Sequence, residues 1–155
     1  MDDIISIKVY KSLRRLELYK GNYLIKAFSI VLGKCPEGKK TREGDDRTPE
    51  GLYYICTRNE KSKYHLFLGL SYPGITDAED GMASKVIDAE TFEKIINSIK
   101  EGHRPPWDTA LGGTVGIHGG GTKNDWTAGC IALSNEDIEE LWQYCPLNTP
   151  VLIEK

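Results

Sequence analysis

Hydrophobic and polar residues alternate along the first part of the chain, and this pattern predicts β-strands. Residues 4–10 and 15–20 alternate with the period of two that is typical of a half-buried strand. Gly21 and Asn22 then form a turn signal, and the largely apolar run 23–32 follows. We therefore predict a first strand and, after it, a β-hairpin.

Two polar segments interrupt this pattern. Residues 33–49 contain Gly, Pro and many charges, and they predict a long loop that is either functional or a solvated connector. Residues 74–85 carry three carboxylates but lack the glycine and the distal glutamate of a calcium-binding loop, so they predict a second solvated loop. The apolar runs at 51–57 and 64–70 predict strands.

The apolar period changes to that of a helix in two places. The first stripe follows Asp88, a candidate N-cap, and ends before Gly102. A second helix is predicted from Ser134, where an acid three residues on completes a capping signal, to about Tyr144, because Pro146 cannot continue it. The first stripe consists of Phe92, Ile95, Ile96 and Ile99.

Three short apolar runs, at 114–118, 130–133 and 149–153, complete the predicted strands. Strands outnumber helices, and successive strands often lack a helix between them. This order predicts a mostly β (α+β) domain of the sandwich type with two attached helices. A chain of 155 residues fits one domain, so residues 1–155 are predicted to form a single unit.

Composition excludes several classes of partner. Charged residues make up 28% of the chain and the net charge is −3, so nothing attracts it to nucleic acid. No apolar run approaches the roughly 20 residues of a membrane span. Residues 1–15 begin with acids and lack an apolar core, so they are not a signal peptide. Either the protein stays inside the cell, or the sequence is a mature form or a piece without its export signal.

Four cysteines are present, and no two form a C-x-x-C motif, so we expect neither a zinc site nor a redox dithiol. We also expect no cofactor. A disulfide between Cys35 and Cys56 stays an alternative to free thiols. Buried free thiols are the expectation for Cys56 and Cys145. Cys130 differs from these because Gly129 comes directly before it.

Cys130 is the candidate nucleophile, and His118, at the end of the predicted strand 114–118, is its candidate base. An imidazolium nearby would lower a thiol pKa from about 8.5 toward about 6. Because nucleophilicity falls with pKa, the rate is expected to come mainly from positioning and from proton transfer to the leaving group. The alternative is that Cys130 is a buried, inert small hydrophobe.

The residues around this pair resemble a known family. The stretch 117–133, IHGGGTKNDWTAGCIAL, resembles the catalytic signature of the L,D-transpeptidase family (YkuD-like domains), in which a His-Gly pair is followed by Ser/Thr-x-Gly-Cys. Residues 43–53 (EGDDRTPEGLY) and 65–73 (HLFLGLSYP) resemble the same family. The resemblance implies a mixed-sheet β-sandwich of the L,D-transpeptidase type and peptidoglycan stem peptides as substrates.

The resemblance also implies roles for single residues. Cys130 would take the acyl group of a stem peptide, with His118 as general base and acid. The carbonyl of Gly119 would orient the imidazole, and the N–H groups of Gly129 and Cys130 would form an oxyanion hole. His65 is either a substrate contact or a structural residue at a strand end. The full set of expected substrate contacts is Gly120, Thr127, Trp126, Lys123, His65 and Arg104.

Two positions depart from the family pattern. Ala128 stands where a second histidine is common, and Ala132 stands where an arginine is common. A branch with Thr-x-Gly-Cys and no arginine includes enzymes that hydrolyse a peptidoglycan linkage, so a hydrolase is the main alternative to a transpeptidase. A non-catalytic wall-binding domain is a third reading, against which the intact His118 and Cys130 argue. We expect a monomer, in the cell envelope if an export signal is missing from this sequence and in the cytoplasm otherwise.

Overall fold

The computed structural model describes residues 4–155, so the two acids of the signal-peptide argument, Asp2 and Asp3, lie outside the described part. Within it, three helices accompany eight strands. The helices are α1 (Ile75–Ala83), α2 (Ala89–Lys100) and α3 (Asn135–Trp142). The strands are β1 (Ile5–Tyr10), β2 (Arg15–Lys20), β3 (Tyr23–Ser29), β4 (Gly51–Ser62), β5 (His65–Leu70), β6 (Gly116–His118), β7 (Ile131–Ala132) and β8 (Pro150–Glu154).

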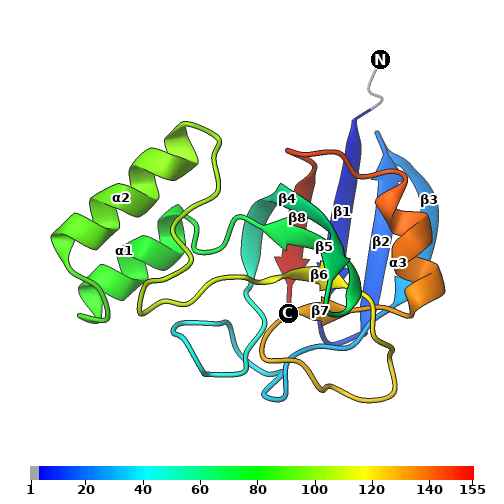
Figure 1. Ribbon diagram of the computed structural model, residues 1–155, viewed down its shortest axis with the longest axis horizontal. Coiled ribbons are helices and arrows are strands. Elements are labelled where there is room, and N and C mark those ends of the chain that lie inside the picture. Colours follow the sequence, from blue (N-terminus) through cyan, green and yellow to red (C-terminus); the bar gives the residue numbers. More distant parts are fainter. Residues whose placement is uncertain (1–3) are drawn as a thin grey trace.

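The strands form one mixed sheet in the order β3-β2-β1-β8-β4-β5-β6-β7. The pairs β1–β8 and β6–β7 are parallel, and the remaining neighbours are antiparallel. Figure 1 shows the last strand, β8, inserted between β1 and β4. This architecture confirms the predicted fold class of a mostly β domain built on a mixed sheet.

The long strand β4 joins the two halves of the sheet. Its first residues pair with β8, and its later residues pair with β5 after a shift in register beyond Ile55. Both halves contribute to one hydrophobic core, in which Ile7 and Leu18 of the first half belong to the same cluster as Leu68 and Ile117 of the second. Burial of these side chains is the main stabilising term of such a sandwich.

The free edges of the sheet also meet. The predicted hairpin is confirmed as the antiparallel pair β2–β3, with Lys20 opposite Tyr23. The strand predicted over 23–32 ends at Ser29, but Val31 continues toward the other edge and exchanges two 3.0 Å backbone hydrogen bonds with Ala132 of β7. The chain that carries the candidate nucleophile is thereby held from both ends of the sheet.

The prediction of a solvated loop over residues 74–85 is wrong, because α1 forms there and raises the number of helices from two to three. The Asp77 carboxylate accepts a hydrogen bond from the N–H of Gly74 and so caps the first turn. Gly81 allows α1 to approach Leu111, since a Cβ at Gly81 would lie 2.7 Å from a Leu111 methyl carbon. Three carboxylates within four residues, 77–80, made this short helix look like a solvated loop in the sequence.

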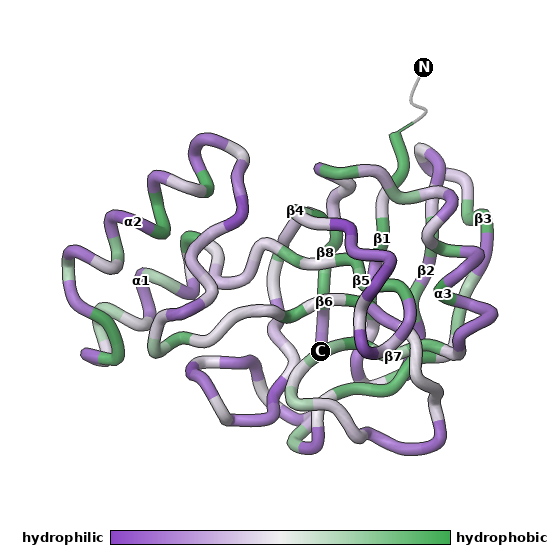
Figure 2. Tube along the Cα trace, viewed as in Figure 1, coloured by the Kyte–Doolittle hydropathy of each residue, from purple (hydrophilic) through white to green (hydrophobic). Residues whose placement is uncertain are grey.

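Helix α2 packs beside α1, outside the sandwich (Figure 1). Asp88 accepts the N–H of Thr91 as the predicted N-cap. Alternating colours along α2 in Figure 2 reflect its amphipathic sequence. Of the predicted stripe, Ile95 is fully buried, and the other three members are half-buried around a second small core.

The last helix, α3, starts at the predicted N-cap Ser134, whose hydroxyl accepts the N–H of Asp137. It ends at Trp142, slightly before the predicted Tyr144. No helix within residues 4–155 combines the length and the apolar character needed to cross a bilayer. The four cysteines are free thiols in the described part of the chain, so Cys35 and Cys56 form no disulfide there.

Candidate active site

His118 and Cys130 are brought together by the shortest strands of the sheet. His118 is the last residue of β6, and Cys130 directly precedes β7, which runs parallel to β6. The pairing places Ile131 beside Ile117 and Ala132 beside His118, and the N–H of Leu133 donates to the His118 carbonyl at 2.8 Å. Both side chains then reach the wall of one cavity.

The tautomer of His118 is fixed by its neighbour. Its Nδ1 lies 2.6 Å from the carbonyl oxygen of Gly119, and because a carbonyl only accepts, Nδ1 carries the proton. The other ring nitrogen, Nε2, then keeps its lone pair. Burial lowers the pKa of His118, although the hydrogen bond to Gly119 works in the opposite direction. The imidazole is therefore neutral at pH 7 and can accept a proton through Nε2.

Aromatic rings enclose this imidazole. Tyr64 stacks on it with ring centres 4.8 Å apart, and Phe67 lies nearly parallel at 6.3 Å. Trp126 meets the imidazole edge-on at 5.6 Å and donates its indole N–H to the carbonyl of Gly121. These contacts restrict the ring to one orientation, which is what a positioned base requires.

The environment of Cys130 keeps the thiol protonated. Its Sγ lies 3.6 Å from the carbonyl oxygen of Thr114, an acceptor for the S–H group. Burial raises the pKa of Cys130 to about 11, against the backbone of Gly116 and the ammonium of Lys40, which lower it. Burial of the thiol thus opposes a pKa near 6, and the resting state that we expect without substrate is a neutral thiol beside a neutral imidazole.

Gly129 and Thr127 fix the turn before the thiol. Gly129 has φ +139°, and a Cβ there would lie 2.7 Å from the carbonyl oxygen of Arg47, so only glycine fits. The Thr127 hydroxyl accepts the N–H of Gly129 at 3.1 Å and donates to the carbonyl of Cys130 at 2.7 Å. Because the Gly129 N–H is occupied, it is not a free oxyanion donor in this conformation. The N–H of Cys130 is the other expected donor.

The long loop 33–49 packs against this turn and supports it. Asp45 accepts hydrogen bonds from three backbone N–H groups and an ion pair from Lys40 at 2.9 Å. Although burial opposes its ionisation, these bonds hold the pKa of Asp45 below its usual value. The loop then passes so close to the turn that a Cβ at Gly33 would lie 3.1 Å from the Cα of Gly129. The loop therefore supports the turn through these contacts, while many of its other residues are exposed.

The cavity that contains the pair has a volume of about 550 Å³. Much of its lining comes from the hairpin between β4 and β5, which Figure 2 shows as hydrophilic, and from the segment after α2. The sequence interpretation missed most of these residues, and the Lys-Ser-Lys run at 61–63 was the available signal. The lining consists of Thr57, Asn59, Lys61, Ser62, Lys63, Tyr64, Phe67, Arg104, Trp107, Thr114, His118 and Cys130.

The structure separates the expected substrate contacts. Arg104 lines the cavity, with its guanidinium carbon 4.8 Å from the centre of the Trp107 ring. Lys123 is exposed and lies outside the lining. His65 is turned toward α3, where its Nε2 lies 2.7 Å from a Glu139 carboxylate oxygen, and it is absent from the cavity lining.

The remaining expected contacts are structural here. Thr127 is 4% exposed, and its hydroxyl both accepts and donates a hydrogen bond within the turn before the thiol. Gly120 donates its N–H to the Asn135 side chain, and a Cβ there would lie 2.8 Å from the Trp126 ring. Trp126 itself contacts His118 and is absent from the cavity lining. All three shape the base and the thiol turn.

Ala132 is the second departure from the family pattern, and the packing around it accounts for a small side chain at this position. The residue is fully buried in β7, between β6 and the backbone of Val31. An arginine would need a different path for its side chain at this point. Cations near the thiol therefore come from other elements.

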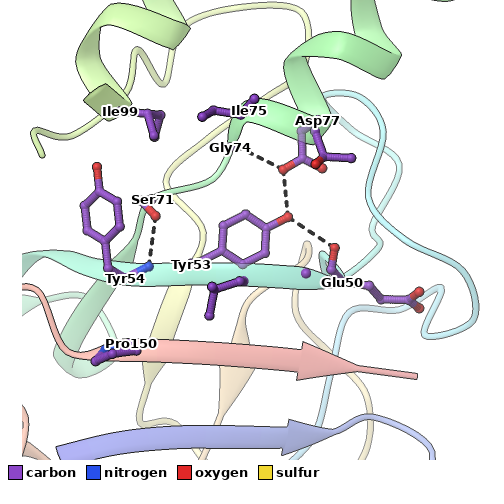
Figure 3. Close-up of a pocket in the computed structure, with 12 residues that line it drawn as sticks. Glu50, Tyr53, Tyr54, Ser71, Gly74, Ile75, Asp77, Ile99 and Pro150 are labelled. Carbon is purple, nitrogen blue, oxygen red and sulfur yellow. Dashed lines mark hydrogen bonds between the residues drawn. The ribbon is translucent and has the colours of Figure 1, made fainter. Parts of the chain in front are cut away.

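A second cavity, of about 470 Å³, lies between α1 and β4 (Figure 3). Its buried Asp77 carboxylate accepts the hydroxyl of Tyr53 at 2.7 Å and the N–H of Gly74 at 2.9 Å. Burial raises the pKa of Asp77, although these hydrogen bonds oppose the shift. The polar groups satisfy one another and tie the helical pair to the sandwich. Neither Cys130 nor His118 reaches this cavity.

Comparisons with known proteins agree with the geometry. A family model described as the L,D-transpeptidase catalytic domain (YkuD) matches residues 5–153. The chain is also 23% identical over 150 residues to YafK of Escherichia coli (strain K12), a match that covers 93% of this chain and 48% of that protein.

Two solved structures share the fold. The helical cell shape determining protein Pgp2 from Campylobacter jejuni has a TM-score of 0.71 at 22% identity, covering 99% of this chain and 48% of that chain. The L,D-transpeptidase of Xylanimonas cellulosilytica DSM 15894 has a TM-score of 0.58 at 12% identity, covering 99% and 62%. The chain spans about half the length of YafK and Pgp2. Since the family model matches nearly the whole chain, the protein belongs to the L,D-transpeptidase catalytic domain family.

Proposed function

We propose that the protein is a cysteine acyltransferase that acts on peptidoglycan stem peptides during crosslinking or remodelling of the cell wall. One observation carries the proposal: Cys130 and a His118 of fixed tautomer line the same cavity, in a chain that belongs to the L,D-transpeptidase family. Cys56 and Cys145 also have raised thiol pKa values, so pKa alone does not single out Cys130. The histidine in the same cavity does.

The proposed reaction begins from the neutral pair. When a stem peptide binds, the Cys130 proton passes to Nε2 of His118 as sulfur attacks the peptide carbonyl carbon. The tetrahedral oxyanion accepts a hydrogen bond from the Cys130 N–H. The carbon–nitrogen bond then breaks, and the proton on Nε2 moves to the leaving amine. A thioester on Cys130 and a free amino acid or peptide result.

Two acceptors can finish the reaction. An amine of a second stem gives a crosslink, and its surplus proton passes to His118. Water gives a free carboxylate and regenerates the thiol. Transpeptidation is proposed first because the family matches, and hydrolysis is the second candidate because Ala132 leaves β7 without the family's cation for an acceptor carboxylate. The proposed site of action is the cell wall, with no cofactor.

A product assay tests both candidates. The protein is incubated with a tetrapeptide donor and increasing concentrations of an amine acceptor, and products are measured by mass spectrometry. Crosslinked product that rises with acceptor supports the transferase. Tripeptide that stays constant as acceptor rises supports the hydrolase. Unchanged donor with no adduct on Cys130 would reject acyl transfer on this substrate.

A further inference from the structure

The wall of the Cys130 cavity carries positive charge without negative charge. Its lining includes Lys61, Lys63 and Arg104 but no Asp or Glu. The chain as a whole has a net charge of −3, and each of four other surface cavities contains at least one carboxylate. Cations gathered without counter-ions raise the local positive potential, so the cavity is suited to an anionic ligand.

Two of these cations contact aromatic rings and are not neutralised by an acid. Within residues 4–155, neither Lys63 nor Arg104 has an acidic side chain within ion-pair distance; the ion pairs of the protein involve other residues. Instead, Arg104 lies over the Trp107 ring, and the Lys63 Nζ lies 5.5 Å from the centre of the Tyr64 ring. An aromatic face orients a cation but leaves its charge available to a ligand.

The aromatic rings connect these two cations through the candidate base. Trp107 contacts Phe67 at 6.5 Å, and Phe67 contacts His118 at 6.3 Å. On the other side, Tyr64 stacks on His118 at 4.8 Å. A substrate with its scissile carbonyl at Cys130 would thus meet one cation in each direction along the wall. The series of contacts reads Arg104, Trp107, Phe67, His118, Tyr64, Lys63.

We propose that this cavity selects a peptide with two carboxylates, one on each side of the bond that is cleaved, and that Arg104 binds one and Lys63 the other. The proposal rests on the proposed function, because it takes the reacting carbonyl to lie between Cys130 and His118. The planar guanidinium of Arg104 can bind a carboxylate through two hydrogen bonds, and the ammonium of Lys63 acts as a point charge. Ala132 stands where an arginine is common in the family, so that position supplies no cation here. Arg104, in the segment before β6, supplies one instead.

Four peptides of one sequence test this. One carboxylate is the C-terminus of the peptide, on one side of the cleaved bond, and the other is on a side chain on the other side of that bond. The four peptides carry both carboxylates, only the C-terminal one, only the side-chain one, or neither, and each missing carboxylate is replaced by an amide. The rate of Cys130 acylation per substrate concentration is measured by mass spectrometry for the wild type, Arg104→Gln and Lys63→Gln. We expect each amide to slow the wild type by about tenfold, equivalent to about 1.4 kcal/mol. Arg104→Gln should remove the penalty for one amide and Lys63→Gln the penalty for the other.

Lys123→Gln is the matched control, since Lys123 is an exposed lysine outside the cavity lining. It should discriminate among the four peptides as the wild type does. Equal acylation rates with all four peptides would overturn the proposal. So would a result in which Arg104→Gln and Lys63→Gln both remove the penalty for the same amide, or in which neither variant removes a penalty. A wild type that none of the peptides acylates would instead remove the proposed function itself, so the two failures are distinguishable.

Discussion

The two cavities described above have similar volumes, about 550 Å³ at Cys130 and about 470 Å³ between α1 and β4, but they differ in how their polar groups are used. In the second cavity, Tyr53, Asp77 and Gly74 satisfy one another. In the first, the Nε2 lone pair of His118 and the Lys63 and Arg104 cations have no hydrogen-bond or ion-pair partner that the structure records within residues 4–155; the two cations contact only aromatic rings. Size does not separate a site from a structural gap; available hydrogen-bonding and charged groups do.

The comparison is sharpest at Cys130. Cys130→Ala should reduce covalent labelling by a carbapenem or a tetrapeptide by at least about 10³-fold, because no other cysteine shares the cavity with His118. The adduct is located by peptide mapping. Labelling of Cys35, Cys56 or Cys145 in wild-type protein with Cys130 unmodified would show that the reactive cysteine lies outside the Cys130 cavity.

The next effect concerns the base. His118→Ala should slow acylation of Cys130 by about 10²–10⁴-fold, since a positioned proton acceptor is lost. His103→Ala is the control, because His103 is exposed beside Glu101 and lies outside the cavity. Stopped-flow or mass-spectrometric acylation rates provide the measurement. Equal losses in two folded variants would contradict the assigned pair.

A pH titration distinguishes a resting neutral thiol from a preformed ion pair. With a thiol pKa near 11, the thiolate fraction and the rate of alkylation by iodoacetamide should rise about tenfold per pH unit between pH 7 and 9. A thiol with a pKa near 6 would instead give a constant rate over this range. The rate is followed at Cys130 by mass spectrometry, with Cys35→Ser protein to remove the exposed thiol.

The smallest effect belongs to the second cavity. Tyr53→Phe removes one donor from the buried Asp77 carboxylate and should lower the free energy of unfolding by about 1–3 kcal/mol. Acylation of Cys130 in the folded variant should be unchanged. Tyr54→Phe, which loses a hydrogen bond from an exposed hydroxyl to the His103 carbonyl, is the matched control for denaturant unfolding. A loss of Cys130 acylation in folded Tyr53→Phe protein would contradict this prediction and show that the two cavities are coupled.

Local pattern was sufficient for much of the fold. Period-two alternation located β1 and the β2–β3 hairpin, and the caps Asp88 and Ser134 located α2 and α3. It failed at α1, because the carboxylate of Asp77 looks solvated in the sequence but is buried against Tyr53 from β4. A contact between residues so distant in the chain cannot be read from a local period.

The same limit applies to the site. The glycines and threonine near Cys130 follow from a contiguous motif, but their work is to fix the turn. The cavity wall comes from the β4–β5 hairpin and from Arg104, which only the sheet order brings to His118. His65 lies two residues before Phe67 and is still turned away, because its left-handed backbone (φ +74°) directs it toward Glu139 of α3.

The central position of β8 has a consequence for how the protein is made. Residues 150–154 join β1 to β4, so a nascent chain that ends before them lacks the strand that connects the two halves of the sheet at its centre. Pairing between the first and last strands is of very long range and is slow to form. The half that contains Cys130 would then remain incompletely packed until translation reaches the last strand. The sheet that carries His118 and Cys130 is therefore complete only once residues 150–154 have been synthesised.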